Sequence, residues 1–576
     1  MSAPTAVRVP EPRTPADDQV NVDVSAPLDM LLADAALGPL RRLLPAGPGV
    51  RLAAALCREP SAVARRARDL AGELGQVLLG RSTAAPGKRD RRFADEAWKD
   101  NAVLRRILQA YLSAGGTARA LLADAELDWR DRARLEFALD NVIAALSPSN
   151  NPVISPTAWK AAIDSGGVNA LRGLRNLLGD LVTAPRVPTM VREDAYEIGV
   201  DVAATPGAVV LRTEVFELVQ YTPQTPTVRT RPLVVVPPVI NKFYVADMAP
   251  GRSLVEYLVQ GGQQVFMVSW RNPDARHRDW GTDTYGAAVV EAVDAALAVT
   301  GADTANLLGF CSGGMLQSMA LAALQEDGRL ADKVSAFGLA VCVLDQARAG
   351  LPGALLDETT AAAAAAVSSA RGYLDGRNLA ELFAWLRPDD LIWNYWVNNY
   401  LLGRDPAPFD ILFWNADTTR MAARLHHDFL DIALHNSLVT PGAARMLDKP
   451  VDLSTVAIDG YVVAGVADHI SPWQNCYTSA RLFGGTTRFV LSTSGHIAAI
   501  VNPPSNPKAT HQVGEDLKSE ADDWQRATPM TKGSWWPDYL AWLTERGGDE
   551  RDAPTELGGA GLVAQESAPG TYVFDR

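Results

Sequence analysis

The sequence of 576 residues contains only four cysteines and seven histidines, and these shortages limit the kinds of site that it can hold. Cys57, Cys311, Cys342 and Cys476 lie far apart and form no Cys-x-x-Cys pair. This spacing excludes a disulfide framework and a standard zinc ribbon, and it fits a reducing, cytoplasmic setting. No residues near the histidines complete a metal-ligand set, so we expect no metal site.

The sequence also has little positive charge and no long apolar run. Lys and Arg number 54 against 67 Asp and Glu, which gives a formal net charge of −13. Nucleic-acid-binding proteins normally carry a basic surface, so we expect no nucleic-acid partner. No run of 18 apolar residues occurs, and the N-terminus has no basic region followed by an apolar core. We therefore expect neither a membrane span nor a signal peptide.

The first third of the chain differs from the rest in its pattern of apolar residues. Residues 1–25 are rich in Pro, Asp and Val without a helical period, which predicts a mobile tail. Residues 26–190 carry apolar side chains at three-to-four spacing, which predicts a helical N-terminal domain. From about residue 191 to 576, short apolar runs alternate with helical stretches, which predicts a catalytic domain of the α/β class.

Within this second region we predict a mostly parallel sheet with helices on both faces. The predicted strands are residues 232–236, 264–269, 305–309, 335–344, 460–465 and 487–491. The predicted helices are residues 253–259, 285–299, 314–325 and 474–482. About 100 residues, 345–452, separate the fourth strand from the fifth. We expect this insertion to form a cap over the carboxyl edge of the strands, where such sheets bind ligands.

A candidate nucleophile follows the third predicted strand. The run from Gly309 to Gly313 reads G-x-C-x-G between a strand and a helix, which is the nucleophile elbow of α/β-hydrolases with Cys311 in place of serine. The elbow spacing favours Cys311 over Ser312, because the residue two before Ser312 is Phe310. The start of the helix also favours a thiolate. The alternative for Cys311 is a small buried hydrophobic residue.

The partners of the nucleophile are expected in the chain order acid, then histidine. His496 follows the last long strand, and Asp468 follows the strand before it, where it can orient the imidazole of His496. His469 is the alternative base, although its place beside Asp468 favours a supporting role. We expect His277 and His511 to be exposed.

An oxyanion hole needs two backbone N–H groups. The N–H of Ser312 is the first candidate. The second comes from the loop after the first predicted strand, where Val239 and Ile240 are both candidates.

Taken together, these residues resemble one family, the polyhydroxyalkanoate synthases, over most of the chain. The motifs are RRFADEAW (91–98), VVPPVINKFY (235–244), SWRNPD (269–274), GFCSGG (309–314), LIWNYWVNNYL (391–401), FDILFWNADTTR (409–420), ADHISPW (467–473), SGHIAAIVNPP (494–504) and GSWWPDYLAWL (533–543). The resemblance implies an α/β-hydrolase fold with a cap and a catalytic triad of Cys311, Asp468 and His496. The size resembles the single-component enzymes, with a lean towards the medium-chain type.

The resemblance also implies the chemistry and its setting. The expected substrate is an (R)-3-hydroxyacyl-CoA thioester, polymerised to a polyester through an acyl-cysteine with release of CoA and without a cofactor. We expect a homodimer on the surface of polyester granules in the cytoplasm, with phasin-type proteins as further partners. Four cap aromatics are candidates for an acyl tunnel, with cap core as the alternative: Trp393, Tyr395, Trp396 and Trp414. The rival functions are a cysteine thioesterase or polyester depolymerase, and a non-catalytic granule-surface protein.

Overall fold

The computed structural model describes residues 46–88, 90–182, 185–346, 358–468 and 470–576. The predicted mobile tail, residues 1–25, lies outside these ranges, and so does His469, the alternative base. None of the described helices is long and apolar enough to cross a membrane.

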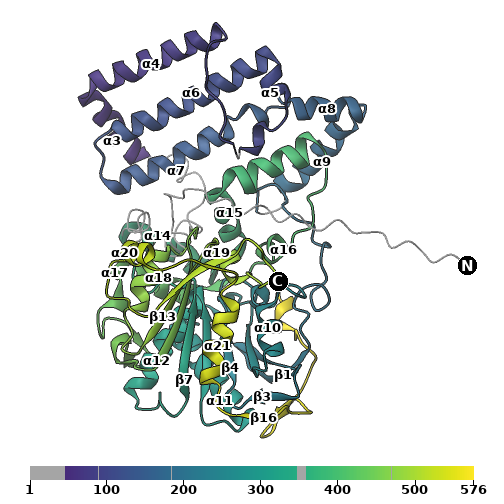
Figure 1. Cartoon of the computed structure of the whole chain (residues 1–576), viewed down its shortest axis with the longest axis vertical. Coiled ribbons are helices and arrows are strands. Elements are labelled where there is room, and N and C mark those ends of the chain that lie inside the picture. Colours follow the sequence, from purple (N-terminus) through teal and green to yellow (C-terminus); the bar gives the residue numbers. More distant parts are fainter. Residues whose placement is uncertain (1–45, 89, 183–184, 347–357, 469) are drawn as a thin grey trace, which may run out of the picture.

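Helices alone make up the first part of the described chain, and Figure 1 shows them grouped on one side of the sheet. They are α3 (Ala46–Arg58), α4 (Pro60–Leu78), α5 (Ala97–Asp100), α6 (Ala102–Asp124), α7 (Trp129–Ala145), α8 (Pro156–Asp164) and α9 (Val168–Val182). Asn101 is the N-cap of α6, because its side chain accepts hydrogen bonds from the N–H groups of Val103 and Leu104. Phe93, Trp98 and Leu108 form a small separate core for these helices.

A ten-stranded sheet forms the rest of the molecule, in the order β1-β2-β5-β4-β6-β7-β12-β13-β14-β15. Its strands are β1 (Gly207–Arg212), β2 (Phe216–Tyr221), β4 (Leu233–Val236), β5 (Val265–Trp270), β6 (Ala305–Phe310), β7 (Val334–Ala340), β12 (Asp459–Gly465), β13 (Thr487–Ser492), β14 (Thr510–Gly514) and β15 (Thr531–Lys532). The six central strands, β5 to β13 in that order, are parallel and are the six predicted strands. The outer four pair antiparallel and were not predicted.

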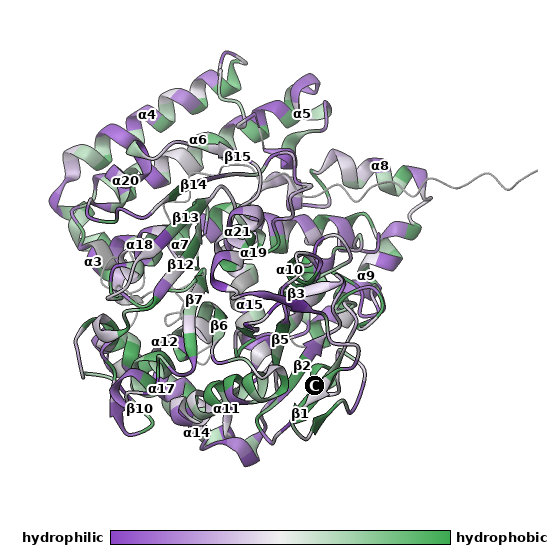
Figure 2. Cartoon of the chain, turned by 60° about the horizontal axis from the view of Figure 1, so that its bottom comes forward, coloured by the Kyte–Doolittle hydropathy of each residue, from purple (hydrophilic) through white to green (hydrophobic). Residues whose placement is uncertain are grey.

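Helices cover both faces of the sheet. This is required because successive side chains of β4 point to opposite faces and all of them are apolar. Val234 and Val236 face the core formed with α11 (Thr282–Thr300) and α12 (Cys311–Glu326). Leu233 and Val235 face the opposite core, formed with α10 (Leu254–Gln260) and α21 (Trp536–Arg546). Both faces of the central strands are therefore apolar, and Figure 2 colours these strands and α11 as hydrophobic. The remaining helices of this part are α18 (Trp473–Ala480), α19 (His496–Ile500) and α20 (Ala521–Ala527).

The predicted insertion lies between β7 and β12. It contains α14 (Glu358–Arg371), α15 (Gly376–Leu386), two π-helical segments η5 (Asp389–Trp393) and η6 (Trp396–Leu401), α16 (Asp410–Ala416) and α17 (Ala423–His435). Figure 1 shows α15 and α16 between the sheet and the N-terminal helices. The insertion thus lies on the side of the sheet where β6 ends and α12 begins.

Short two-strand pairings complete the fold and join distant parts of the chain. They pair β3 (Thr227–Arg229) with β16 (Glu550–Asp552), β8 (Tyr373–Leu374) with β9 (Met421–Ala422), β10 (Arg445–Met446) with β11 (Lys449–Pro450), and β17 (Gly558–Gly559) with β18 (Leu562–Val563). The chain ends with one turn of 3-10 helix, η9 (Tyr572–Phe574), and Figure 1 shows the C-terminus close to α16.

Candidate active site

Cys311 occupies a sharp turn between β6 and α12. Its backbone φ is +48°, in the left-handed region that non-glycine residues rarely adopt. Its side chain is buried, with 7% exposed. A strained residue held between a buried strand and a buried helix is typical of a functional position.

Gly313 makes this turn possible. A Cβ atom at that position would lie 2.3 Å from the carbonyl oxygen of Pro237 and 2.5 Å from that of Val236. Both oxygens belong to the end of β4 and the start of its loop, so any side chain would push the first turn of α12 away from the sheet. The second glycine of the G-x-C-x-G motif is therefore required for steric reasons.

The structure brings His496 and Asp468 together, although 28 residues separate them in the chain. His496 begins α19, directly after β13, and its Nδ1 lies 2.8 Å from Oδ2 of Asp468. The other carboxylate oxygen of Asp468 accepts hydrogen bonds from the N–H groups of Ile470 and Ser471, each at 2.8 Å. The Asp468 carboxylate is thus held from two sides, and it fixes the plane of the imidazole.

The third member of the predicted triad also contacts this histidine. Burial lowers the pKa of His496, but the charge of Asp468 and hydrogen bonds with Asp468 and Cys311 outweigh burial and raise the pKa to about 10. The site therefore stabilises an imidazolium beside the Cys311 sulfur. His496 is therefore placed to take the proton of the Cys311 thiol, and the thiolate is the nucleophilic form of cysteine.

The other cysteines lie in different environments. Burial raises the pKa of the Cys342 and Cys476 thiols well above the ordinary value, so both are neutral thiols at neutral pH. Cys57 is exposed on α3.

The loop after β4 reaches the first turn of α12. The Val239 N–H donates a hydrogen bond to Oγ of Ser312 at 3.2 Å, so this N–H points at the residue that follows Cys311. The Val239 and Ile240 carbonyls accept hydrogen bonds from the Oγ1 and the N–H of Thr419, in the insertion. The N–H of Ser312 lies in the first turn of α12, where helical N–H groups have no intrahelical partner. This contact shows where the Val239 N–H points, and the choice between Val239 and Ile240 as the second oxyanion donor stays a prediction.

The four cap aromatics divide into two groups. Trp414 is buried on α16, and its Nε1 donates to the carbonyl oxygen of Lys242 at 2.7 Å, in the loop after β4. Trp393 and Trp396 pack on each other with ring centroids 5.7 Å apart. Trp396 also donates to the carbonyl oxygen of Asn150, among the N-terminal helices, at 3.1 Å. Their place in an acyl tunnel stays a prediction.

Tyr395 lies between Trp393 and Trp396 in the chain. Burial raises the pKa of its hydroxyl to about 12, so Tyr395 is neutral at the pH of the cell.

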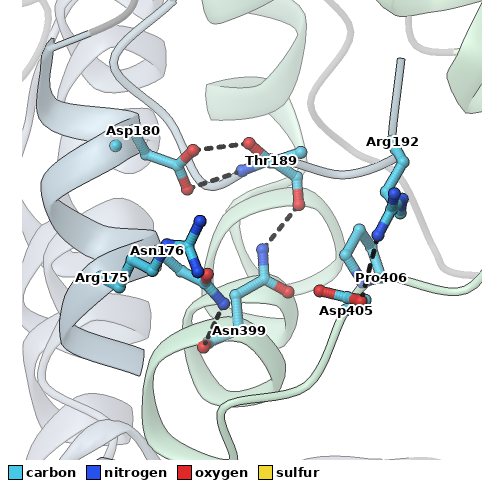
Figure 3. A pocket seen from close by; sticks show the side chains of 9 residues that line it. Arg175, Asn176, Asp180, Thr189, Arg192, Asn399, Asp405 and Pro406 are labelled. Atoms are coloured by element: carbon cyan, nitrogen blue, oxygen red, sulfur yellow. Dashed lines mark hydrogen bonds and ion pairs between the residues drawn. The ribbon is translucent and has the colours of Figure 1, made fainter. Parts of the chain in front are cut away.

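A pocket of about 280 Å³ lies where α9 meets η6 and the segment that follows it (Figure 3). Hydrogen bonds link Thr189 to Asp180 and to Asn399, and Arg192 pairs with Asp405 across it. The pocket is lined by Arg175, Asn176, Gly179, Asp180, Thr189, Arg192, Asn399, Asp405 and Pro406. These residues join the N-terminal helices to the insertion, and none of them belongs to the predicted triad.

The prediction that His277 and His511 are exposed is wrong, because both are buried. Nδ1 of His277 accepts a hydrogen bond from the N–H of Asp274 at 3.0 Å, and Nδ1 of His511 lies 2.9 Å from the carbonyl oxygen of Gly533. The His277 imidazole thus completes a local turn, whereas the His511 imidazole joins β14 to the segment after β15. No group of three or more His, Cys, Asp or Glu residues within the described ranges could hold a metal ion.

Comparison with known proteins identifies the family and the fold of the chain. The family described as "Poly-beta-hydroxybutyrate polymerase (PhaC) N-terminus" matches residues 89–258, and the family described as "alpha/beta hydrolase fold" matches residues 241–503. A protein of Ectopseudomonas oleovorans named poly(3-hydroxyalkanoate) polymerase 1 is 45% identical over 90% of this chain and 92% of its own length. A poly(3-hydroxyalkanoate) polymerase subunit of Cupriavidus necator is 39% identical over 88% of this chain and 87% of its own length.

These matches confirm the predicted fold class and the predicted resemblance. Both relatives are matched over nearly their whole length, so the likeness includes the helical region, the sheet and the insertion together. The chain therefore belongs to the poly(3-hydroxyalkanoate) polymerase family, built on the α/β-hydrolase fold.

Proposed function

We propose that this chain polymerises (R)-3-hydroxyacyl-CoA thioesters into polyhydroxyalkanoate, with release of CoA, through an ester chain held on Cys311. One observation carries the proposal: Cys311 stands at a strained elbow and interacts with His496, whose Nδ1 lies 2.8 Å from the Asp468 carboxylate. The names of the relatives support the same activity.

The first step is acyl transfer to the enzyme. The Cys311 thiolate attacks the thioester carbonyl, and the new carbon–sulfur bond produces a tetrahedral oxyanion. The N–H groups of Ser312 and of Val239 or Ile240 are the candidates for stabilising that negative charge. The bond to CoA then breaks, and the His496 imidazolium gives its proton to the departing CoA thiolate.

The second step extends the chain. The hydroxyl group of a hydroxyacyl unit attacks the acyl-cysteine, while neutral His496, oriented by Asp468, removes the hydroxyl proton. A carbon–oxygen ester bond forms and the carbon–sulfur bond to Cys311 breaks, which regenerates the thiolate and the imidazolium. Water must be kept out for transfer to exceed hydrolysis, and an apolar insertion over the site supports this.

The proposal extends to the setting of the enzyme. The chemistry requires no metal or redox cofactor, since CoA belongs to the substrate. We place the enzyme as a homodimer on the surface of its polyester granule in the cytoplasm, with phasin-type proteins beside it. Among substrates we expect the medium-chain monomers to react faster, on the basis of the HRDWGTDTYG motif (277–286).

The test is CoA release from (R)-3-hydroxybutyryl-CoA and (R)-3-hydroxyoctanoyl-CoA, with the product extracted and sized. We expect polymer from the wild type, none from Cys311→Ala, and full activity from Cys57→Ala, the control at an exposed cysteine. CoA release with only free hydroxyacid would indicate the rival thioesterase. Activity in Cys311→Ala would overturn the assignment of the nucleophile, and no CoA release from any hydroxyacyl-CoA would indicate a non-catalytic granule protein.

A further inference from the structure

Lys242 is a buried cation that the mechanism above does not use. It follows the loop after β4, and only 3% of the residue is exposed. Lysine is almost never fully buried without partners, because an ammonium group loses its hydration there. Nζ of Lys242 donates to the carbonyl oxygens of Tyr572 at 3.2 Å and of Asp575 at 2.6 Å. Both carbonyls belong to the last six residues of the chain, 571–576, which we call the C-terminal strap.

The C-terminal strap is anchored to the sheet at its other end. Glu217 on β2 has a fully buried side chain. Its carboxylate accepts hydrogen bonds from the N–H groups of Thr571 and Tyr572, both at 2.9 Å, and from Oγ1 of Thr571 at 2.7 Å. The guanidinium of Arg271, which follows β5, lies 4.2 Å from the centre of the Tyr572 ring. The strap therefore presents its carbonyls to Lys242 from a fixed position.

On its other side, the loop that carries Lys242 contacts the insertion. The Lys242 carbonyl oxygen accepts the hydrogen bond from Trp414 described above. Asn272 joins the same parts a second time, since its Nδ2 donates to the Asp575 carbonyl at 3.2 Å and its Oδ1 accepts from the Arg420 N–H at 2.8 Å. The loop after β4, the loop after β5, the insertion and the C-terminal strap thus meet around Lys242.

Lys242 is also only three residues from Val239, whose N–H points at the first turn of α12. We propose that Lys242 is a positioning residue for acyl transfer: by binding two carbonyls of the C-terminal strap, it holds the loop after β4 so that the Val239 N–H faces the elbow of Cys311. The inference rests on the proposed function, because a donor at this place matters only if an oxyanion forms there. It assigns a role to the otherwise unexplained lysine of VVPPVINKFY and to the chain end.

The charges around Lys242 support a structural role for its ammonium group rather than a role in proton transfer. Burial lowers the pKa of Lys242 to about 8, although Asp417 and Asp575 act in the opposite direction; Arg576 and Arg420 lower it further. At neutral pH the ammonium is therefore present and depends on the two strap carbonyls as acceptors. Loss of those carbonyls would leave a buried charge unpaired, which is far more costly than replacing the whole arrangement by an apolar group.

The test is a double-mutant cycle between Lys242→Met and a chain that ends at Gly570. We expect Lys242→Met to lower kcat about 10-fold or more, within the effect of weakening one oxyanion donor, and to change KM less than about threefold. The chain that ends at Gly570 should show a similar decrease in kcat. Because both changes break the same contact, the double variant should lose no more than either alone, and Lys242→Met should raise the Tm of the truncated chain. Lys449→Met, which removes a surface lysine paired with Asp327, is the matched control and should leave kcat and KM unchanged.

Two results would overturn the proposal: an unchanged kcat in Lys242→Met, or losses that multiply in the double variant. Alkylation of Cys311 by iodoacetamide separates this inference from the proposed function, because Lys242→Met should leave that rate unchanged. Activity in Cys311→Ala would instead overturn the function itself. If Lys242→Met does not fold, Asn272→Ala takes its place in the cycle, since it removes one hydrogen bond to the strap together with one to the Arg420 N–H, and an unchanged kcat there refutes the role of the strap.

Discussion

The contribution of Asp468 can be tested by Asp468→Asn, which keeps the shape of the side chain and removes its charge. In the folded protein the pKa of His496 is raised from 6.5 to about 10. One pKa unit corresponds to about 1.4 kcal/mol, so the imidazolium is stabilised by roughly 5 kcal/mol net of the cost of burial, and Asp468 and Cys311 together supply more than this net figure. Removing the charge of Asp468 should lower kcat by about 10⁴-fold, the loss that Asp→Asn causes in a Ser-His-Asp triad.

The assay is the initial rate of CoA release at saturating substrate, compared with Asp538→Asn. Asp538 accepts hydrogen bonds from Tyr461 and Arg488, away from Cys311, and its replacement should leave kcat within about twofold of the wild type. Alkylation of Cys311 by iodoacetamide should also slow in Asp468→Asn, because the imidazolium beside the sulfur is weakened. If Asp468→Asn keeps more than a tenth of the wild-type kcat, Asp468 does not orient the base and the reasoning fails.

Three further predictions follow from the same geometry. Gly313→Ala should lower the Tm sharply or prevent folding, because its Cβ would lie 2.3 Å from a backbone oxygen, whereas Gly116→Ala on α6, with open space around it, should raise the Tm slightly; equal shifts would contradict the steric argument. His496→Gln should destabilise the protein most at low pH. A raised pKa gives stabilisation that is complete below about pH 6.5 and is lost as the pH rises through about 10, so the Tm difference from wild type should shrink over that interval, and a difference independent of pH would count against the ion pair. Cys342→Ala should cost about 1 kcal/mol in urea unfolding and leave CoA release unchanged, because burial keeps this thiol neutral; a lost activity would mean that Cys342 takes part in transfer.

The central sheet was predictable because its strands are buried on both faces and therefore appear as continuous apolar runs. The outer strands lack that signal. β2 contains Glu217 with a fully buried side chain, which pairs with Arg212 on β1 and also accepts hydrogen bonds from residues near position 571, more than 350 positions away; the sequence does not show this second set of partners. Strands that bury a charged group for a distant partner cannot be recognised from local composition.

Among the site residues, local spacing was sufficient for Cys311, and the order of the fold was sufficient to select Asp468 and His496. The choice between Val239 and Ile240 was not open to such reasoning, because adjacent N–H groups in a loop point in different directions. His511 shows the same limit, since it bonds to the carbonyl of Gly533, 22 residues further along the chain.

By itself, the sequence predicted the parallel core, the turn at Cys311 and the pairing of Asp468 with His496, because each depends on residues that are neighbours in the chain or follow the regular order of strands. Only the tertiary structure decided which N–H faces the elbow, where the cap aromatics lie and what surrounds Lys242. Those features depend on contacts between segments up to 333 residues apart, such as Lys242 and Asp575. Such contacts form only when the loops, the insertion and the chain end fold against one another.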